Sequence, residues 1–291
     1  MNTKVEIKMI EWFDDHFYKV VYLNEQGVEV VDYLPSITTK LGALHKPWLS
    51  KWRGTVGNTE ADRIMRESAD EGSLLHWAWY TITTGGAVLY QHPRTPTYTQ
   101  EQLNAIYEQY HGNVVKVNTQ YQMWTMLRLQ DWWKIVGPKS VESELILYDL
   151  ENRDSGTADN FMYINEGNYM INGAKPLSLP TGMYVVDLKT GKTVDDVAKM
   201  QLSAYAKMYE KTHDANIEGA LIIHTQSSTR KGIENLSTIH VDKDGIDQYY
   251  SDYRDIARVW DRNFGTKKPI IRDIPTVVSL EQFTWDPEPK A

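Results

Sequence analysis

Residues 185–191 read Val185-Val186-Asp187-Leu188-Lys189-Thr190-Gly191, an apolar run that leads into an acid and a lysine two positions apart. The run predicts a buried strand over 183–189. Because side chains alternate between the faces of a strand, we expect Asp187 and Lys189 to point one way and Leu188 into the opposite layer. A carboxylate that suits hard metal ions then lies beside a cation that can hold a water or a phosphate oxygen. Taken alone, such a triplet is more often a surface ion pair.

The elements around this strand predict a mixed α/β core. Alternation of apolar and polar residues indicates four further strands, at 139–149, 156–164, 217–225 and 234–241. A helical pattern over 194–211 separates two of the strands, and a helix at about 244–262 follows the last one. Strands that alternate with helices in this way form a sheet with helices packed against it.

We expect a single domain, because no internal repeat or long linker divides the chain. Its regions are an N-terminal β-hairpin (1–34), a helical region (35–137), the core (138–241), and a C-terminal helix and irregular tail (242–291). Ser36 is the expected cap of the first helix. The predicted fold class is α/β, with a central mixed β-sheet flanked by helices and a helical N-terminal region.

The composition excludes several kinds of site and partner. The 291 residues include no cysteine, which rules out disulfides, thiolate zinc sites, cysteine-ligated iron–sulfur clusters and a cysteine nucleophile. The 31 Lys+Arg and 39 Asp+Glu residues give a net charge of −8, which argues against coating of duplex DNA by bulk electrostatics. Ten Trp and 18 Tyr supply aromatic rings, some of which could stack on bases.

A long helix carries the first polar candidate outside the central strand. The helix is expected to begin after Gly57-Asn58 and to end at Gly85-Gly86, with an apolar stripe that starts at Ala61. Gly72 and His76 are four residues apart and share that face, so His76 should look into the protein. A satisfied core histidine beside a helix-packing glycine is the common alternative.

Acidic residues occur on two of the predicted strands. Glu142 and Glu144 share one face of the strand at 139–149, a pattern that usually marks a solvated edge. Asp159 follows Ser155-Gly156-Thr157-Ala158, a tight entry into an apolar strand, and a turn-capping aspartate is the alternative there.

The helix after the central strand carries a polar pair. Gln201 and Tyr205 lie one helical turn apart, and Gln201 stands among inward-facing apolar positions. A buried glutamine needs hydrogen-bond partners, so we expect these two residues to belong to a polar network. A local contact inside the core is the simpler explanation.

The order of these pieces resembles the RecB-like branch of the PD-(D/E)xK nuclease superfamily, with phage exonucleases and the mitochondrial genome maintenance exonuclease as similar members. The segments that carry the resemblance are Gly72–His76, Glu144–Leu147, Gly156–Asp159, Asp187–Gly191 and Gln201–Tyr205, preceded by Leu34–Thr39 and Trp48–Arg53. Each motif is loose, but their joint order is specific. The resemblance implies a restriction-endonuclease-like core and covers roughly residues 34–226.

The resemblance also implies a role for each matched residue. The ligands of Mg²⁺ or Mn²⁺ would be His76, Asp159, Asp187 and the Leu188 carbonyl. Lys189 would position the attacking water and help to activate it. Glu144, chosen over Glu142 because Leu-Ile-Leu follows it, would complete or support the site. Gln201 and Tyr205 would brace the site or touch the substrate.

Two further segments are candidates for contact with the substrate. Bases and aromatic residues alternate upstream of His76, and the candidate substrate-binding residues are Lys46, Trp48, Lys51, Trp52, Arg53, Arg63 and Arg66. A helix with Trp in the core and Lys in solvent explains the same spacing. Residues 165–182 are longer than a compact hairpin, which suggests an insertion that faces the substrate.

We therefore expect a metal-dependent deoxyribonuclease that hydrolyses phosphodiester bonds, an exonuclease acting on single-stranded DNA or DNA ends. The alternatives are a structure-specific endonuclease and a nucleic-acid-binding module with a silent site. DNA is the expected partner, and we expect no association with a membrane. Residues 1–11 resemble neither a signal nor a transit peptide, so the expected location is the cytoplasm, with a bacterial or phage source.

Overall fold

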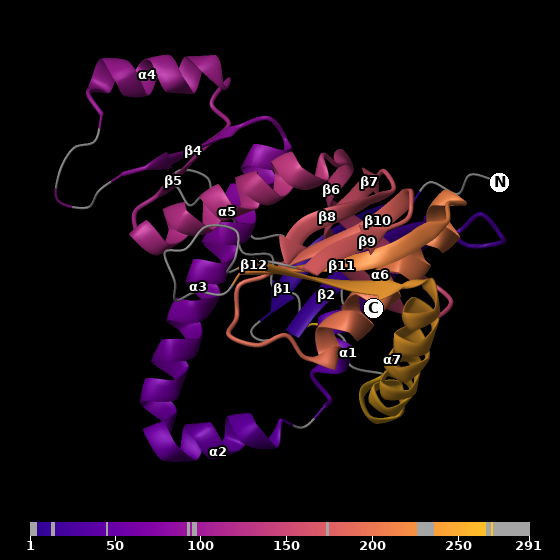
Figure 1. Ribbon diagram of the computed structural model, residues 1–291. Coiled ribbons are helices and arrows are strands. Elements are labelled where there is room, and N and C mark those ends of the chain that lie inside the picture. Colours follow the sequence, from indigo (N-terminus) through magenta and orange to yellow (C-terminus); the bar gives the residue numbers. More distant parts are fainter. Residues whose placement is uncertain are drawn as a thin grey trace, which may run out of the picture.

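A mixed five-stranded sheet lies at the centre of the computed structural model (Figure 1). Its strands are β6 (Lys139–Asp149), β7 (Asp154–Ile164), β10 (Gly182–Lys189), β11 (Ile217–Thr225) and β12 (Leu236–Asp242). The order is β12-β11-β10-β7-β6; β10 and β11 are parallel, and the other neighbouring strands are antiparallel. The prediction of an α/β fold with a central mixed sheet is confirmed.

The structure describes residues 5–12, 15–44, 46–91, 94, 98–172, 175–225, 236–265 and 269. The C-terminal tail expected after the last helix lies almost entirely outside this set, since residues 270–291 are not among the described residues. Among the described residues, no helix combines the length and the apolar character that crossing a bilayer requires.

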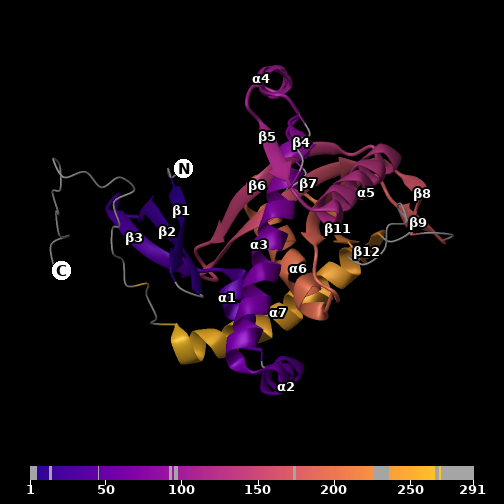
Figure 2. The same ribbon diagram turned by 90° about the vertical axis from the view of Figure 1, so that its left-hand side faces the viewer.

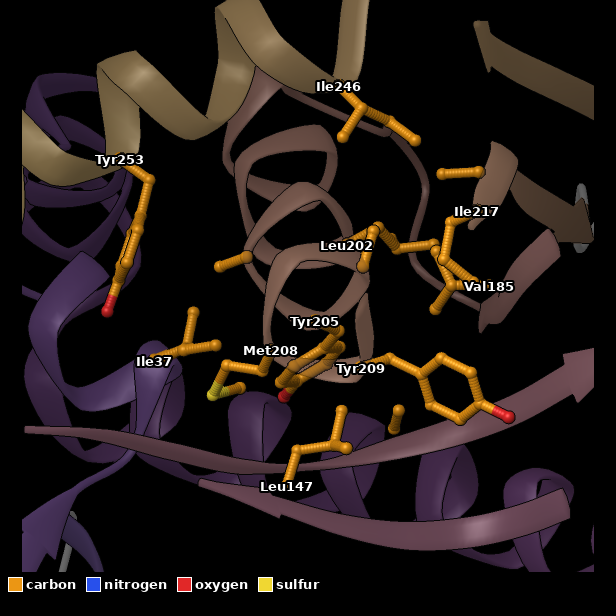
Figure 3. Packing of buried hydrophobic residues seen from close by; sticks show 14 of the residues in the cluster. Ile37, Leu147, Val185, Leu202, Tyr205, Met208, Tyr209, Ile217, Ile246 and Tyr253 are labelled. Atoms are coloured by element: carbon orange, nitrogen blue, oxygen red, sulfur yellow. The ribbon is translucent and has the colours of Figure 1, made fainter. Parts of the chain in front are cut away.

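Helices cover both faces of the sheet and bury two apolar clusters. One cluster forms against α1 (Ile37–Leu41), α6 (Asp196–His213) and α7 (Lys243–Phe264). Figure 3 shows Leu202 and Tyr205 of α6 in this cluster, close to Val185 of β10. The other cluster forms against α3 (Asn58–Thr83) and α5 (Gln120–Val136).

Strand β10 is buried on both faces, as its apolar sequence predicts. Val185 belongs to the cluster against α6, whereas Val186 and Leu188 belong to the cluster against α3 and α5. The alternation expected from the sequence is therefore confirmed, and Leu188 does enter the opposite layer. The turn after β10 leads into α6, which crosses over to the parallel strand β11.

Three smaller sheets surround the core. The hairpin predicted within 1–34 is a three-stranded antiparallel sheet of β1 (Glu6–Trp12), β2 (Asp15–Leu23) and β3 (Glu29–Pro35). The region 35–137, predicted as helical, also contains a parallel pair, β4 (Ala87–Tyr90) and β5 (Val114–Val117), joined through α4 (Gln100–Gln109). The excursion at 165–182 forms a hairpin of β8 (Gly167–Asn172) and β9 (Lys175–Leu179).

Helix α3 extends well beyond the core at its N-terminal end. It carries α2 (Pro47–Val56) there and leads to β4 at the other end (Figures 1 and 2). Before Leu75, only Ala61 of the predicted apolar stripe is buried, and Met65 is exposed. The prediction that this stripe faces the core was therefore wrong for the first half of α3, because α2 is the only described element that covers that half.

A buried charged cluster ties α1 and α7 to the start of β7. The side chain of Lys40 is fully buried, and its Nζ lies 2.7 Å from Asp154 Oδ1 and 3.0 Å from Asp261 Oδ1. Asp154 also accepts hydrogen bonds from Tyr253 and Arg254 of α7. Ser36 Oγ accepts from Thr39 N, which confirms the predicted cap and fixes the start of α1.

Replacing Lys40 by alanine should lower the free energy of unfolding by roughly 3–5 kcal/mol, because it leaves the buried Asp154 carboxylate without its lysine partner. Chemical denaturation monitored by circular dichroism measures this loss. The matched control is Lys199→Ala, which removes an ion pair to the exposed Asp196 and should cost below about 1 kcal/mol. Equal losses in the two variants would contradict the assigned role of the buried cluster.

Candidate active site

The acid and the lysine at the end of β10 begin a chain of polar contacts. Lys189 Nζ lies 2.8 Å from Asp187 Oδ2 and donates a hydrogen bond to Asp187 Oδ1 at 3.1 Å. The same Nζ donates to Gln201 Oε1 at 3.2 Å, and Gln201 Nε2 donates to the Tyr205 hydroxyl at 3.2 Å. Gln201 and Tyr205 therefore hold the ammonium group from α6, which is the bracing arrangement expected from the sequence.

A second acid reaches the same end of the sheet from β7. Asp159 Oδ2 accepts a hydrogen bond from the Leu188 main-chain N–H at 3.0 Å and lies 3.0 Å from His76 Nδ1. These two contacts join β7 to β10 and to α3. His76, Asp159, Asp187 and Lys189, which are far apart in the sequence, are thus brought together.

Glu144 reaches the site because its backbone breaks the alternation of β6. Its φ is 51°, in the left-handed region that non-glycine residues rarely adopt. Glu144 faces the cavity beside His76 and Asp159, whereas Glu142 interacts electrostatically with Tyr209 of α6. The expectation that Glu142 and Glu144 share one face was therefore wrong.

Two glycines of the sequence motifs leave room for site residues. A Cβ at Gly156 would lie 2.5 Å from Tyr205 Cε1, a distance that side chains do not tolerate. A Cβ at Gly72 would lie 3.2 Å from Thr190 Oγ1, which is the residue after Lys189. The glycines thus allow α6 to approach β7, and α3 to approach the end of β10.

Burial and neighbouring charges shift the pKa values of the groups around Asp159. Burial alone would lower the pKa of His76, but the Asp159 carboxylate outweighs it and raises that pKa to about 9. Burial would raise the pKa of Asp159, yet the His76 charge and the hydrogen bonds it accepts hold it below its usual value. Burial and the nearby Asp159 charge raise the pKa of Glu144 to about 6.

In the pair formed by Asp187 and Lys189, the pKa of the acid is shifted in the direction opposite to that of Asp159. Burial, together with repulsion from Asp159, raises the pKa of Asp187 in spite of Lys189. Burial would lower the pKa of Lys189, but the charge of Asp187 and its hydrogen bond raise it. The two carboxylates therefore interact strongly, and each has one cationic partner.

The donor set suits a small divalent cation. Two carboxylates and one imidazole provide the oxygen-rich ligands that Mg²⁺ and Mn²⁺ accept. Asp187 Oδ2 is buried and has no aligned hydrogen-bond donor, but it forms an ion pair with the Lys189 ammonium group 2.8 Å away. Within the described ranges, no three acidic or histidine side chains converge as a formed metal cluster, since Asp159 contacts His76 and Asp187 contacts Lys189.

A cavity of about 800 Å³ opens beside this group of residues; His76, Glu144 and Asp159 line it, whereas Asp187 and Lys189 do not. Its lining comes from β1, α3, β6, β7 and the turn after β10, and consists of Met9, Ser68, Ala69, Gly72, Ser73, His76, Trp77, Tyr80, Glu144, Asp159 and Thr190. Sequence analysis did not single out Trp77 and Tyr80. Tyr80 had a signal, because it lies four residues after His76 and shares its helix face, whereas Trp77 directly follows His76 and had no such signal.

Another residue that sequence analysis missed holds the turn after β10. His224 of β11 is buried, and its Nε2 lies 2.7 Å from the Gly191 carbonyl oxygen. This contact fixes the loop that follows Lys189. Its signal in the sequence was weak, because a histidine in an apolar strand does not show which loop it meets.

The basic and aromatic residues predicted to bind substrate lie elsewhere. They belong to α2, its cap and the exposed half of α3, and none of them lines the cavity. Arg53 pairs with Asp62, and Arg63 pairs with Glu60 and Glu67. The alternative with Trp in a core is wrong, because α2 buries no residue and Trp48 is 62% exposed.

The hairpin of β8 and β9 does not face the site. It packs against α5 and β12 and lies well away from α2 (Figure 2). None of its residues lines the cavity. The expectation of an insertion that faces the substrate was wrong, since the hairpin extends the core against α5 instead.

The comparisons with known proteins add no relative to this description. No protein-family model matches the chain, and no curated protein matches its sequence.

Replacing Gly156 by alanine should destabilise the protein by roughly 1–3 kcal/mol, because the added methyl group overlaps the Tyr205 ring. The free energy of unfolding from chemical denaturation measures the effect. Gly54→Ala is the matched control, since a Cβ there meets nothing within 4 Å and alanine favours the helix. If Gly156→Ala were as stable as the wild type, the close approach of α6 to β7 would be refuted.

Proposed function

We propose that this chain is a metal-dependent deoxyribonuclease, and that it acts as an exonuclease on single-stranded DNA or DNA ends. The observation that carries the proposal is the Asp187–Lys189 pair, held by Gln201 and placed beside the Asp159–His76 pair at one end of the sheet. Paired carboxylates next to a lysine are suited to hydrolysis of a phosphodiester.

The architecture supports a restriction-endonuclease-like core in this proposal. The antiparallel strands β6, β7 and β10 are followed by α6 and by β11, which is parallel to β10. Both acids and the lysine come from the two central strands of that unit. The candidate residues thus occupy the rigid part of the fold rather than its loops, which favours a fixed geometry for catalysis.

The proposed ligands of Mg²⁺ or Mn²⁺ are Asp159 and Asp187, assisted by His76 and the Leu188 carbonyl. When bound, the ion would neutralise charge on the phosphoryl oxygens and lower the pKa of a coordinated water. Lys189 donates hydrogen bonds from a buried ammonium group and can orient the attacking water or the scissile phosphate. Gln201 and Tyr205 keep that ammonium group in place.

Glu144 has a distinct part in the proposed reaction. Its side chain is on the cavity side of Asp159, and its raised pKa of about 6 allows it to exchange a proton near neutral pH. The strained backbone at φ 51° places the carboxylate there. Retention of a strained residue at such a position is typical of functional sites.

The size of the cavity favours an unpaired strand. Its volume of about 800 Å³ matches pockets that enclose a ligand of a few hundred daltons, not the full width of a duplex. A strand end or a single strand can bring one phosphate to Asp159, which lines the cavity and interacts electrostatically with Asp187. The proposed substrate is therefore single-stranded DNA or a frayed end.

Asp187→Asn and Lys189→Ala should each reduce hydrolysis of 5′-labelled linear single-stranded DNA by about a hundredfold or more, because the first removes the charge of a proposed metal ligand and the second removes the cation that orients the water or the scissile phosphate. The loss is measured from the initial rate with Mg²⁺ or Mn²⁺. EDTA should abolish the wild-type activity, and added metal should restore it.

The matched controls are Asp196→Asn and Lys199→Ala, which alter an exposed acid and its lysine partner on α6. Both should retain wild-type rates. Full activity in Asp187→Asn and Lys189→Ala, or in wild-type enzyme with EDTA, would exclude the proposed site.

A covalently closed single-stranded circle should resist the enzyme while the linear strand of the same sequence is degraded, because an exonuclease needs an end. Gel electrophoresis of both substrates with Mg²⁺ measures the difference, and the first labelled product gives the direction. Asp187→Asn serves as the blank. Cutting of the circle would refute the exonuclease and assign an endonuclease.

A further inference from the structure

Two aromatic residues line the cavity without any part in the proposed chemistry. Trp77 is 66% exposed and Tyr80 is 38% exposed. They are three residues apart on α3, so they lie on neighbouring turns of one helix face. Both line the cavity that contains His76 and Asp159. Large aromatic groups left open to water beside a polar site are typical of ligand contact.

Trp77 also borders a second cavity, of about 380 Å³. Trp77 and Ser73 line both cavities, so Trp77 stands between them. The second cavity continues to β5, where the exposed Lys116 lies in its lining. A path thus leads from the carboxylates, past an exposed indole, to a lysine.

The charged residues along this path do not by themselves hold an anionic ligand. Among the described residues that line the two cavities, the acids are Glu144 and Asp159, and the bases are His76 and Lys116. The negative charges of Glu144 and Asp159 repel the phosphates of a nucleic acid. Contacts that do not depend on charge are therefore needed, and an exposed aromatic face provides them through stacking.

We propose that Trp77 and Tyr80 form a stacking platform for the bases of an unpaired DNA strand, and that Lys116 contacts the strand's phosphates beyond Trp77. The proposal rests on the deoxyribonuclease function, and it assigns the unpaired strand as the substrate class. Bases in the interior of a duplex are stacked on each other and cannot lie on an indole unless the duplex opens. The platform therefore selects unpaired DNA without reading its sequence.

Binding of a short labelled oligothymidylate tests the platform. Fluorescence anisotropy at low salt with EDTA gives the dissociation constant while hydrolysis is suppressed. Trp77→Ala and Trp77→Leu should each weaken binding by about tenfold, because both remove the stacking face. Trp77→Phe retains an aromatic ring and should keep most of the affinity. The control Trp124→Ala, which changes an exposed tryptophan on α5 outside both cavities, should bind as the wild type does.

The outcomes separate the platform from the proposed hydrolysis. Wild-type affinity in Trp77→Ala, or full restoration by leucine, would overturn the platform even if hydrolysis of the linear strand is intact. Loss of binding in Trp77→Ala, with no hydrolysis by the wild type, would support the platform and remove the nuclease function. In an active enzyme, Trp77→Ala should raise KM about tenfold with little change in kcat. Failure of the wild type to bind the oligonucleotide would overturn the platform.

Discussion

The placement of two interacting carboxylates in a buried site is the constraint on which the rest of the structure depends. Asp159 and Asp187 repel each other, and burial penalises the charge of both. Each acid is offset by a cation from a different part of the chain, His76 from α3 and Lys189 from β10. The arrangement therefore forms only when α3 packs on the sheet, which makes the long helix part of the candidate site.

Strand β7 is the element that transmits this constraint through the fold. Asp154 at its start is bonded to α1 and α7, Gly156 admits the Tyr205 ring of α6, and Asp159 contacts α3. Helices from both faces of the sheet are thus fixed on six consecutive residues of one strand. A displacement of β7 would disturb the buried charges around both Asp154 and Asp159. The contacts of Asp154 and Gly156 therefore help to fix the position of Asp159, in addition to its own contacts in the site.

Local pattern was sufficient for the core but not for details that depend on tertiary contact. The alternation in β10 predicted that Asp187 and Lys189 would share a face, and the period of α6 predicted an inward-facing Gln201, because those patterns report burial directly. That Gln201 would belong to the same site was implied by the resemblance alone. The positive φ of Glu144 had no signal, since glutamate is not a residue that marks left-handed backbone. The exposed half of α3 was misassigned because apolar spacing shows a face and not whether anything covers it.

The same limit applies to the cationic segment, whose residues lie on α2, its cap and the exposed half of α3, outside the cavity beside His76. Arg53 and Arg63 are matched by acids on α3, so their charges are offset within the protein. In a chain of net charge −8, attraction of a nucleic acid through bulk charge is unfavourable. Exposed aromatic faces avoid that problem, because stacking energy does not depend on net charge and is less sensitive to salt than phosphate pairing. Under the proposed function, an acidic protein would therefore hold a single strand by its bases, while the acid and the lysine at the end of β10 act on the phosphate.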